Sequence, residues 1–142
     1  MTATSIASFS QAAQQAQEWV NELANDLNWD RHKAYRLLRS ILHAVRDWLP
    51  QEEMADLSAQ LPTLIRGIYF ENWDPLNTPV WERSKQDFLR TIEEGFSDDD
   101  LTDVEVAIAS AFRLLDRHIS HGEIVQVRSS MRKSLRELWP TD

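Results

Sequence analysis

The chain repeats itself with a period of about seventy residues, and this repeat limits the folds open to it more than any other feature. When residues 34–69 are placed on residues 104–139, fifteen of the seventeen apolar positions in the second segment meet an apolar residue in the first, whereas random placement would match about half. The matched pairs include Leu38/Ile108, Leu42/Phe112, Ile65/Leu135 and Tyr69/Trp139, and Ser40, Glu53 and Arg66 recur unchanged as Ser110, Glu123 and Arg136. We therefore predict one domain, residues 1–142, built from two pseudo-repeated halves, residues 8–73 and 78–139.

Apolar residues recur every three to four positions, and no stretch alternates apolar and polar residues. This spacing is that of helices with one buried face, and the chain has only three glycines to interrupt them. We predict an all-α fold, a helical bundle of about eight helices. Helix starts are marked by Asp30, Pro50, Pro62, the pair Thr78-Pro79, and two capping boxes at 102–105 and 120–123.

The helices expected at residues 30–49 and 103–119 differ in how much of their surface is apolar. The first has one apolar side, and its opposite side carries basic groups at spacings of four and three. The second has apolar groups around nearly the whole cylinder, so most of its surface must be covered. We expect residues 103–119 to lie centrally or to form a dimer contact.

Composition excludes several classes of function. The chain has 142 residues, no cysteine and a net charge of −8. The lack of cysteine rules out disulfides, thiolate metal sites and cysteine nucleophiles. Because the acidic excess is spread over both halves, we expect no nucleic-acid partner. No apolar run is long enough to cross a bilayer, and residues 1–20 lack the features of a secretory signal, so we expect a cytoplasmic protein without a membrane partner.

Residues 38–75, LRSILHAVRDWLPQEEMADLSAQLPTLIRGIYFENWDP, carry a specific set of motifs. The set includes Leu42-His43-Ala44-Val45-Arg46-Asp47, Ala59-Gln60-Leu61-Pro62, Leu64-Ile65-Arg66-Gly67 and Tyr69-Phe70-Glu71 with Trp73, and the second half adds Gly122-Glu123 and Leu135-Arg136-Glu137-Leu138-Trp139. This pattern closely resembles the bacterial family called domain of unknown function 2267. The chain departs from it at Asn72, where glycine is usual, and at Met131-Arg132, where Leu-Pro is usual. The resemblance implies an all-α protein of two similar halves and implies no established activity.

A row of basic side chains on residues 30–49 is the first candidate site. The candidate ligand-binding residues are Arg36, Arg39, His43 and Arg46 from this row, together with Arg66. Such groups can bind an anionic ligand or an acidic protein partner. We favour the alternative that the row is a solvated face whose arginines pair with neighbouring acids.

The recurrence of Arg66 as Arg136 predicts a structural role. We expect each of these arginines to form a salt bridge or a helix cap in its own half. Gly67 does not recur, because Glu137 takes its place. A glycine inside a helix is costly, so we expect a close backbone contact or a kink at Gly67.

No pattern supports a metal, a cofactor or a catalytic residue. His118, His121 and Glu123 could hold a metal, but they straddle a helix end and no second cluster supplies further ligands. The acidic run from Asp98 to Asp103 lacks the ligand spacing of a calcium loop. Phosphate-binding loops, nucleophile elbows and zinc-hydrolase motifs are missing. We expect no cofactor and lean towards a protein that is not an enzyme.

Tyr69, Phe70, Trp73 and Trp81 are candidate interface residues, because aromatic side chains near a loop anchor many interfaces. The same residues can fill the space where helix pairs meet, and we favour that interpretation. The function that we expect is that of an interaction, assembly or regulatory module, either a homodimer or the partner of an acidic protein. The alternative is a carrier or sensor of a small anionic ligand bound between the two halves.

Overall fold

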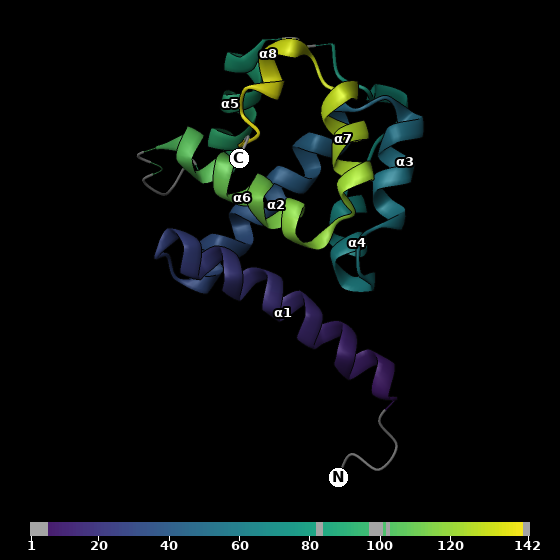
Figure 1. Ribbon diagram of the computed structural model, residues 1–142, viewed down its shortest axis with the longest axis vertical. Helices are drawn as coiled ribbons and strands as arrows, with labels where there is room; N and C mark the ends of the chain where they lie inside the picture. Colours follow the sequence, from purple (N-terminus) through teal and green to yellow (C-terminus); the bar gives the residue numbers. More distant parts are fainter. Residues whose placement is uncertain (1–5, 82–83, 97–100, 102, 141–142) are drawn as a thin grey trace.

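The structure, a computed structural model, describes residues 6–81, 84–96, 101 and 103–140. These residues form eight α-helices and one 3₁₀ helix and contain no strand, so the predicted all-α class is confirmed (Figure 1). The first four helices are α1 (Ala7–Leu27), α2 (Arg31–Trp48), α3 (Gln51–Ala59) and α4 (Thr63–Phe70). The 3₁₀ helix η1 (Pro75–Asn77) follows, and then come α5 (Lys85–Glu94), α6 (Val104–His118), α7 (His121–Ser130) and α8 (Lys133–Arg136).

Several helices begin where the cap signals predict. Asp30 accepts a hydrogen bond from the backbone N–H of Lys33 at 2.9 Å, at the start of α2. Pro50 and Pro62 stand immediately before α3 and α4. Proline is suited to these places because the first backbone N–H groups of a helix have no partner within it.

Two predicted starts are shifted. The start at Thr78-Pro79 is wrong, because α5 begins at Lys85 with Ser84 as its cap. A serine hydroxyl there accepts a free backbone N–H of the first turn, which the proline ring does not do. The cap of α6 is Asp103, and Thr102 lies outside the described residues.

The most covered helix in the described part of the chain is α2. It contacts α1, α3, α4, α5 and α6, and no residue from Lys33 to Leu49 is exposed. In contrast, α6 contacts α1, α2, α5 and α7 but leaves Glu105, Val106 and Arg113 exposed. Helix α2, whose basic side we expected to face solvent, is therefore the more enclosed of the two. The reason is that the polar side of α2 lies against other parts of the chain and not against solvent.

Some helix contacts come in matched pairs when each helix is exchanged with its counterpart in the sequence repeat, but the contacts of α2 and α3 with α4 have no counterparts of similar extent at α8. The contact of α1 with α6 corresponds to that of α5 with α2, and the contact of α1 with α4 corresponds to that of α5 with α8. The contacts α2–α6 and α3–α7 correspond to themselves. One cluster of buried apolar side chains draws on all these helices. The division into two pseudo-repeated halves therefore stays a prediction from the sequence.

At two positions the chain has a residue other than the usual one of the family pattern, and the backbone conformation there suits both residues. Asn72, just after α4, has a φ of 60°, in the left-handed region that glycine and asparagine adopt most easily. Arg132, just before α8, has a φ of −58°, which is also the value that a proline ring imposes. Both substitutions therefore keep the local backbone.

The expected close contact at Gly67 is wrong. A Cβ atom added to Gly67 would meet no neighbouring atom within 4 Å. The close contact occurs in the second half instead, where a Cβ atom on Gly95 would lie 2.5 Å from the Ser40 hydroxyl oxygen. Gly95 therefore allows the end of α5 to approach α2.

Substitution of Gly67 by alanine is expected to raise the free energy of unfolding by about 0.5–1 kcal/mol, because alanine loses less backbone freedom in a helix. Gly95→Ala is the matched control and is expected to lower it, because the new methyl group would displace Ser40. Urea unfolding followed by circular dichroism measures both effects. If the two substitutions changed the stability in the same direction, the assignment of the close contact to Gly95 would be refuted.

Candidate functional site

The predicted basic row lies against the C-terminal end of α4. Arg39, His43 and Arg46 come from successive turns of α2 and all reach this end. His43 Nε2 lies 2.7 Å from the carbonyl oxygen of Ile68, and Arg39 Nε donates to Glu71 Oε1 at 3.2 Å. The row therefore contacts a neighbouring helix. This role differs from both roles considered from the sequence, a ligand-binding site and a solvated face.

Arg46 makes the most extensive of these contacts and is only 4% exposed. Its Nη1 donates to the carbonyl oxygens of Tyr69 at 2.8 Å and Glu71 at 2.7 Å, while its Nε and Nη2 donate to the Asp47 carboxylate at 2.7 and 3.1 Å. The last carbonyl groups of a helix have no partner within it and carry partial negative charge. Arg46 supplies that partner, and Asp47 balances the buried positive charge.

Burial lowers the pKa of His43, and the nearby cations of Arg46 and Arg39 lower it further, against the opposing effect of the bond to Ile68. A neutral His43 donates its Nε2 proton to that carbonyl oxygen. Arg36 differs from the rest of the row, because its guanidinium carbon lies 5.1 Å from the centre of the Phe96 ring.

Arg66 and Arg136 each cap a short helix, which confirms the expectation of a cap in both halves. Arg66 donates to carbonyl oxygens at the end of α3, and Arg136 donates to carbonyl oxygens at the end of α7. The acceptors, in matching order, are Ser58 (2.8 Å) and Leu61 (2.9 Å) for Arg66, and Arg128 (3.0 Å) and Met131 (3.1 Å) for Arg136. Both arginines are therefore occupied by the backbone.

The four aromatic candidates lie in different environments. Tyr69 is fully buried, and its hydroxyl donates to the carbonyl oxygen of Met54 at 2.9 Å. Phe70 packs edge-on against Tyr69 and Trp73, with ring centres 5.1 and 5.6 Å apart. Trp81 is 84% exposed. Tyr69 therefore belongs to the core, and Trp81 is the member of the set that presents its ring to solvent.

Glu53 and Glu123, which are identical in the repeat, lie on α3 and α7, two helices in contact. In the described part of the chain, the Oε2 atom of each is buried without a hydrogen-bond partner. Burial raises the pKa of both carboxyl groups, and the charge of Glu53 raises that of Glu123 further. Their recurrence in the sequence was the signal that could have identified this pair.

The histidine candidates do not form a metal site with their neighbours. His118 Nε2 lies 2.8 Å from Glu22 Oε2, and its ring stacks on Trp19 with 4.6 Å between centres, so it joins α6 to α1. Among the described residues, no three histidine, aspartate or glutamate side chains are placed to hold a metal ion. The acidic run at 98–100 lies outside the described residues.

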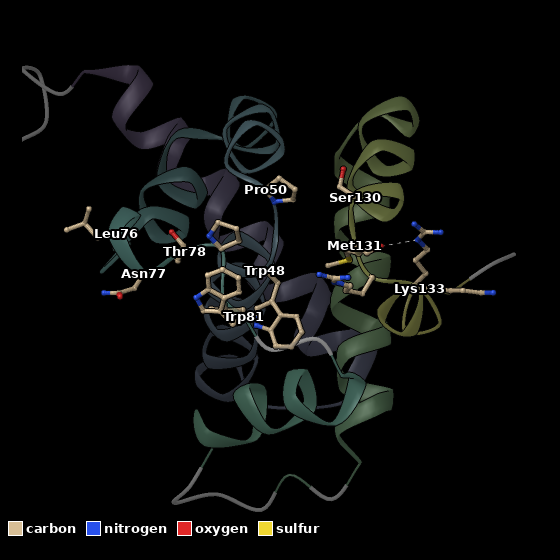
Figure 2. A pocket seen from close by; sticks show the side chains of 13 residues that line it. Trp48, Pro50, Leu76, Asn77, Thr78, Trp81, Ser130, Met131 and Lys133 are labelled. Atoms are coloured by element: carbon tan, nitrogen blue, oxygen red, sulfur yellow. Dashed lines mark hydrogen bonds between the residues drawn. The ribbon is translucent and has the colours of Figure 1, made fainter.

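Several hollows open on the surface of the described residues. A groove of about 520 Å³ lies between α1, α2 and α4, and its apolar lining includes Ala13, Ala16, Leu64 and Ile68. A pocket of about 650 Å³ lies where the connection after α4 meets the end of α2 and the turn between α7 and α8 (Figure 2). Arg136 lines this pocket, but the predicted ligand-binding residues Arg36, Arg39, His43, Arg46 and Arg66 line neither it nor the groove. Of these five, His43 lines a smaller hollow of about 230 Å³, together with Ser40 and Thr91.

Comparison with known proteins gives a family but no activity. The sequence profile of a family described as "Uncharacterized conserved protein (DUF2267)" matches residues 16–138. No functionally curated protein matched the chain. None of the described helices is both long and apolar enough to pass through a membrane.

Substitution of Arg46 by methionine is expected to lower the free energy of unfolding by roughly 3 kcal/mol, because two buried carbonyl groups lose their donor and Asp47 loses its counter-ion. Arg39→Met is the control, and it is expected to cost less than about 1 kcal/mol because the Arg39–Glu71 pair is largely solvated. Urea unfolding measures both. Similar costs for the two variants would contradict the capping role of Arg46.

Glu53→Gln is expected to raise the melting temperature at pH 7. The folded state raises the pKa of this carboxyl group, so its contribution to stability is fully present below the unfolded-state value and is lost as the pH rises through the folded-state value. The gain from the amide should therefore shrink as the pH falls towards 4, where the carboxyl group is protonated in both states. Glu18→Gln, at an exposed position of α1, is the control and should show no such gain. If the gain in melting temperature did not depend on pH, the destabilising effect of the ionised Glu53 carboxyl group would be refuted.

Proposed function

The chain belongs to the DUF2267 family of uncharacterised conserved proteins, whose description assigns no activity. We propose that it is an assembly module that pairs with a second copy through the first half of α1. The observation that supports this proposal is an apolar stripe on α1 that continues beyond the core. Its members are Ile6, Phe9, Ala13, Ala16, Val20, Leu23 and Leu27, at alternating spacings of three and four.

The second half of this stripe is covered and the first half is not. Val20 and Leu23 are buried in the core. From Ile6 to Glu18, every residue is exposed except Ala12 and Ala16, which are partly buried. Figure 1 shows this part of α1 extending away from the other helices. Most helical stability in proteins comes from packing of an apolar face, so a partner on this segment would stabilise the start of α1.

A second copy fits this stripe better than an acidic protein does. Residues 6–17 contain no charged side chain, although the whole chain carries a net charge of −8. Two copies can therefore approach each other at this segment with the least electrostatic repulsion. An acidic partner would need cations on the stripe itself, whereas Arg31 and His32 line the adjoining groove from α2.

An antiparallel pair of α1 helices gives a complementary set of sizes. In the register that places Phe9 opposite the partner copy's Ala13, Ile6 lies opposite the partner copy's Ala16. Each contact layer then joins one large and one small side chain, and small residues allow helices to approach closely. Phe9 is 70% exposed in one copy, and Ala13 and Ala16 open into the apolar groove beside Leu64. A twofold axis makes both contacts identical.

The alternative of an anionic ligand held by the basic row of α2 has less support. Arg46 and His43 already bond to carbonyl groups of α4, and Arg39 pairs with Glu71. Releasing them would leave the end of α4 without its cap.

Phe9→Glu is expected to weaken self-association at least tenfold, because it places a charge in each of two symmetry-related contacts. Light scattering and sedimentation over a range of concentrations measure the dissociation constant. Phe9 is mostly exposed, so the fold of the single copy should be unchanged by circular dichroism apart from the start of α1.

The matched control is Gln11→Glu, which adds the same charge on the opposite side of α1 and should leave the dimer intact. A protein that stays monomeric at millimolar concentration would refute the proposal. Equal weakening by the two substitutions would refute the role of the stripe.

A further inference from the structure

The pocket between the α4–α5 connection and the α7–α8 turn has two chemically different walls. Trp48 and Pro50, at the end of α2, and Trp81, in the connection, supply one wall. Arg132, Lys133 and Arg136 supply the other, together with the buried Met131. In Figure 2 Trp48 and Trp81 are on one side of the hollow, and Met131 and Lys133 are on the other.

The charge of this pocket is opposite to that of the protein. Its lining contains three cations and no aspartate or glutamate, whereas the whole chain has 23 acidic and 15 basic side chains. Neither Arg132 nor Lys133 forms an ion pair with another described residue. A concave site lined by one sign of charge concentrates ligands of the other sign.

The cation wall contains one fixed group. The Nε and Nη2 atoms of Arg136 donate to carbonyl oxygens at the end of α7. These bonds hold the guanidinium group at the edge of the pocket without neutralising its charge. A cation that is already in position loses little side-chain entropy when an anion binds.

The connection that leads to Trp81 is hydrogen-bonded to the rest of the fold. The Val80 N–H donates to the Asp47 carbonyl oxygen at 2.9 Å, which ties the connection to the end of α2 next to Trp81. Within the connection, Trp73 Nε1 donates to Thr78 Oγ1 at 3.1 Å, and Thr78 Oγ1 donates to the Asp74 carbonyl oxygen at 3.0 Å. Trp81 therefore has an exposed ring, and the backbone just before it is held by hydrogen bonds.

We infer that this pocket binds a small organic anion with a flat apolar or aromatic body, which packs between the tryptophans while its charged group meets Arg132 and Lys133. Tryptophan presents a large flat apolar surface, and an arginine side chain binds carboxylate, sulfonate or phosphate oxygens. The volume of about 650 Å³ lies within the usual range for small-molecule sites. The site lies apart from the α1 stripe and goes beyond the assembly function proposed above.

The first experiment uses 8-anilinonaphthalene-1-sulfonate, a fluorescent aromatic anion, as the probe. It is expected to bind the wild-type protein at one site per chain. Trp81→Ala and the double variant Arg132→Gln/Lys133→Gln are each expected to weaken binding at least tenfold. All three side chains are exposed, so these variants should keep their circular dichroism spectrum and melting temperature. Arg113→Gln removes an exposed cation elsewhere, on α6, and should leave the affinity unchanged.

The uncharged analogue N-phenyl-1-naphthylamine separates the two walls. It lacks the sulfonate group, so it should bind at least tenfold more weakly than the sulfonate. Because it retains the aromatic body, its affinity should fall with Trp81→Ala but not with the double variant. Leu64→Gln, in the groove beside α1, should change neither affinity.

Three results would overturn the inference. One is equal affinity for the charged and the uncharged probe, and another is sulfonate binding that survives the double variant. The third is no binding of the sulfonate together with binding of an acidic peptide, which would make the pocket a protein-docking site. None of these readouts depends on whether the protein is a dimer, because Phe9→Glu should leave the affinity for the sulfonate unchanged.

Discussion

Arg46, a buried arginine of α2, donates hydrogen bonds to the last carbonyl groups of α4. The positions of several neighbouring elements depend on this contact. A buried guanidinium group is costly without partners, so Asp47 and the end of α4 must both reach Arg46. The position of α4 then places Tyr69 in the core, where its hydroxyl bonds to α3. The backbone of Asp47 in turn accepts the Val80 N–H, so the connection that carries Trp81 is fixed by the same region of α2.

The second part of the chain solves the same problem with different side chains. Seventy positions after Arg39, His43 and Arg46 stand Ala109, Arg113 and Asp116, which cannot reproduce the cap. Trp139 takes the place of Tyr69 and stacks on Phe112, with 4.0 Å between ring centres, and α8 has only four residues. Arg132 and Lys133 are not needed to hold a helix end, and they face the pocket instead. The proposed binding pocket therefore lies at the place where the second half differs from the first.

The sequence was sufficient for those parts of the fold that depend on local signals. Apolar spacing predicts the helices, and the recurrence of Arg66 as Arg136 predicts a cap that both arginines form. The same spacing could not predict that the basic side of α2 is covered, because it shows which side chains are polar but not which carbonyl groups will lie opposite them. Gly67 and Gly95 illustrate the same limit, since only the assembled fold shows that Gly95, at the end of α5, is the one that lies against a neighbour. Trp81 was one of the four aromatic candidates, and its exposure depends on a connection whose path the sequence does not specify.

The two proposals depend on the two places where the surface departs from an acidic character. The start of α1 has no charge, which is what two chains of charge −8 require at a mutual contact. The pocket beside α8 has an excess of cations, which is what an organic anion requires. Figure 1 places α8 and the first turns of α1 at opposite ends of the molecule. An antiparallel α1 pair would therefore leave both pockets open at the outer ends of the dimer, so assembly and ligand binding need not compete for the same surface.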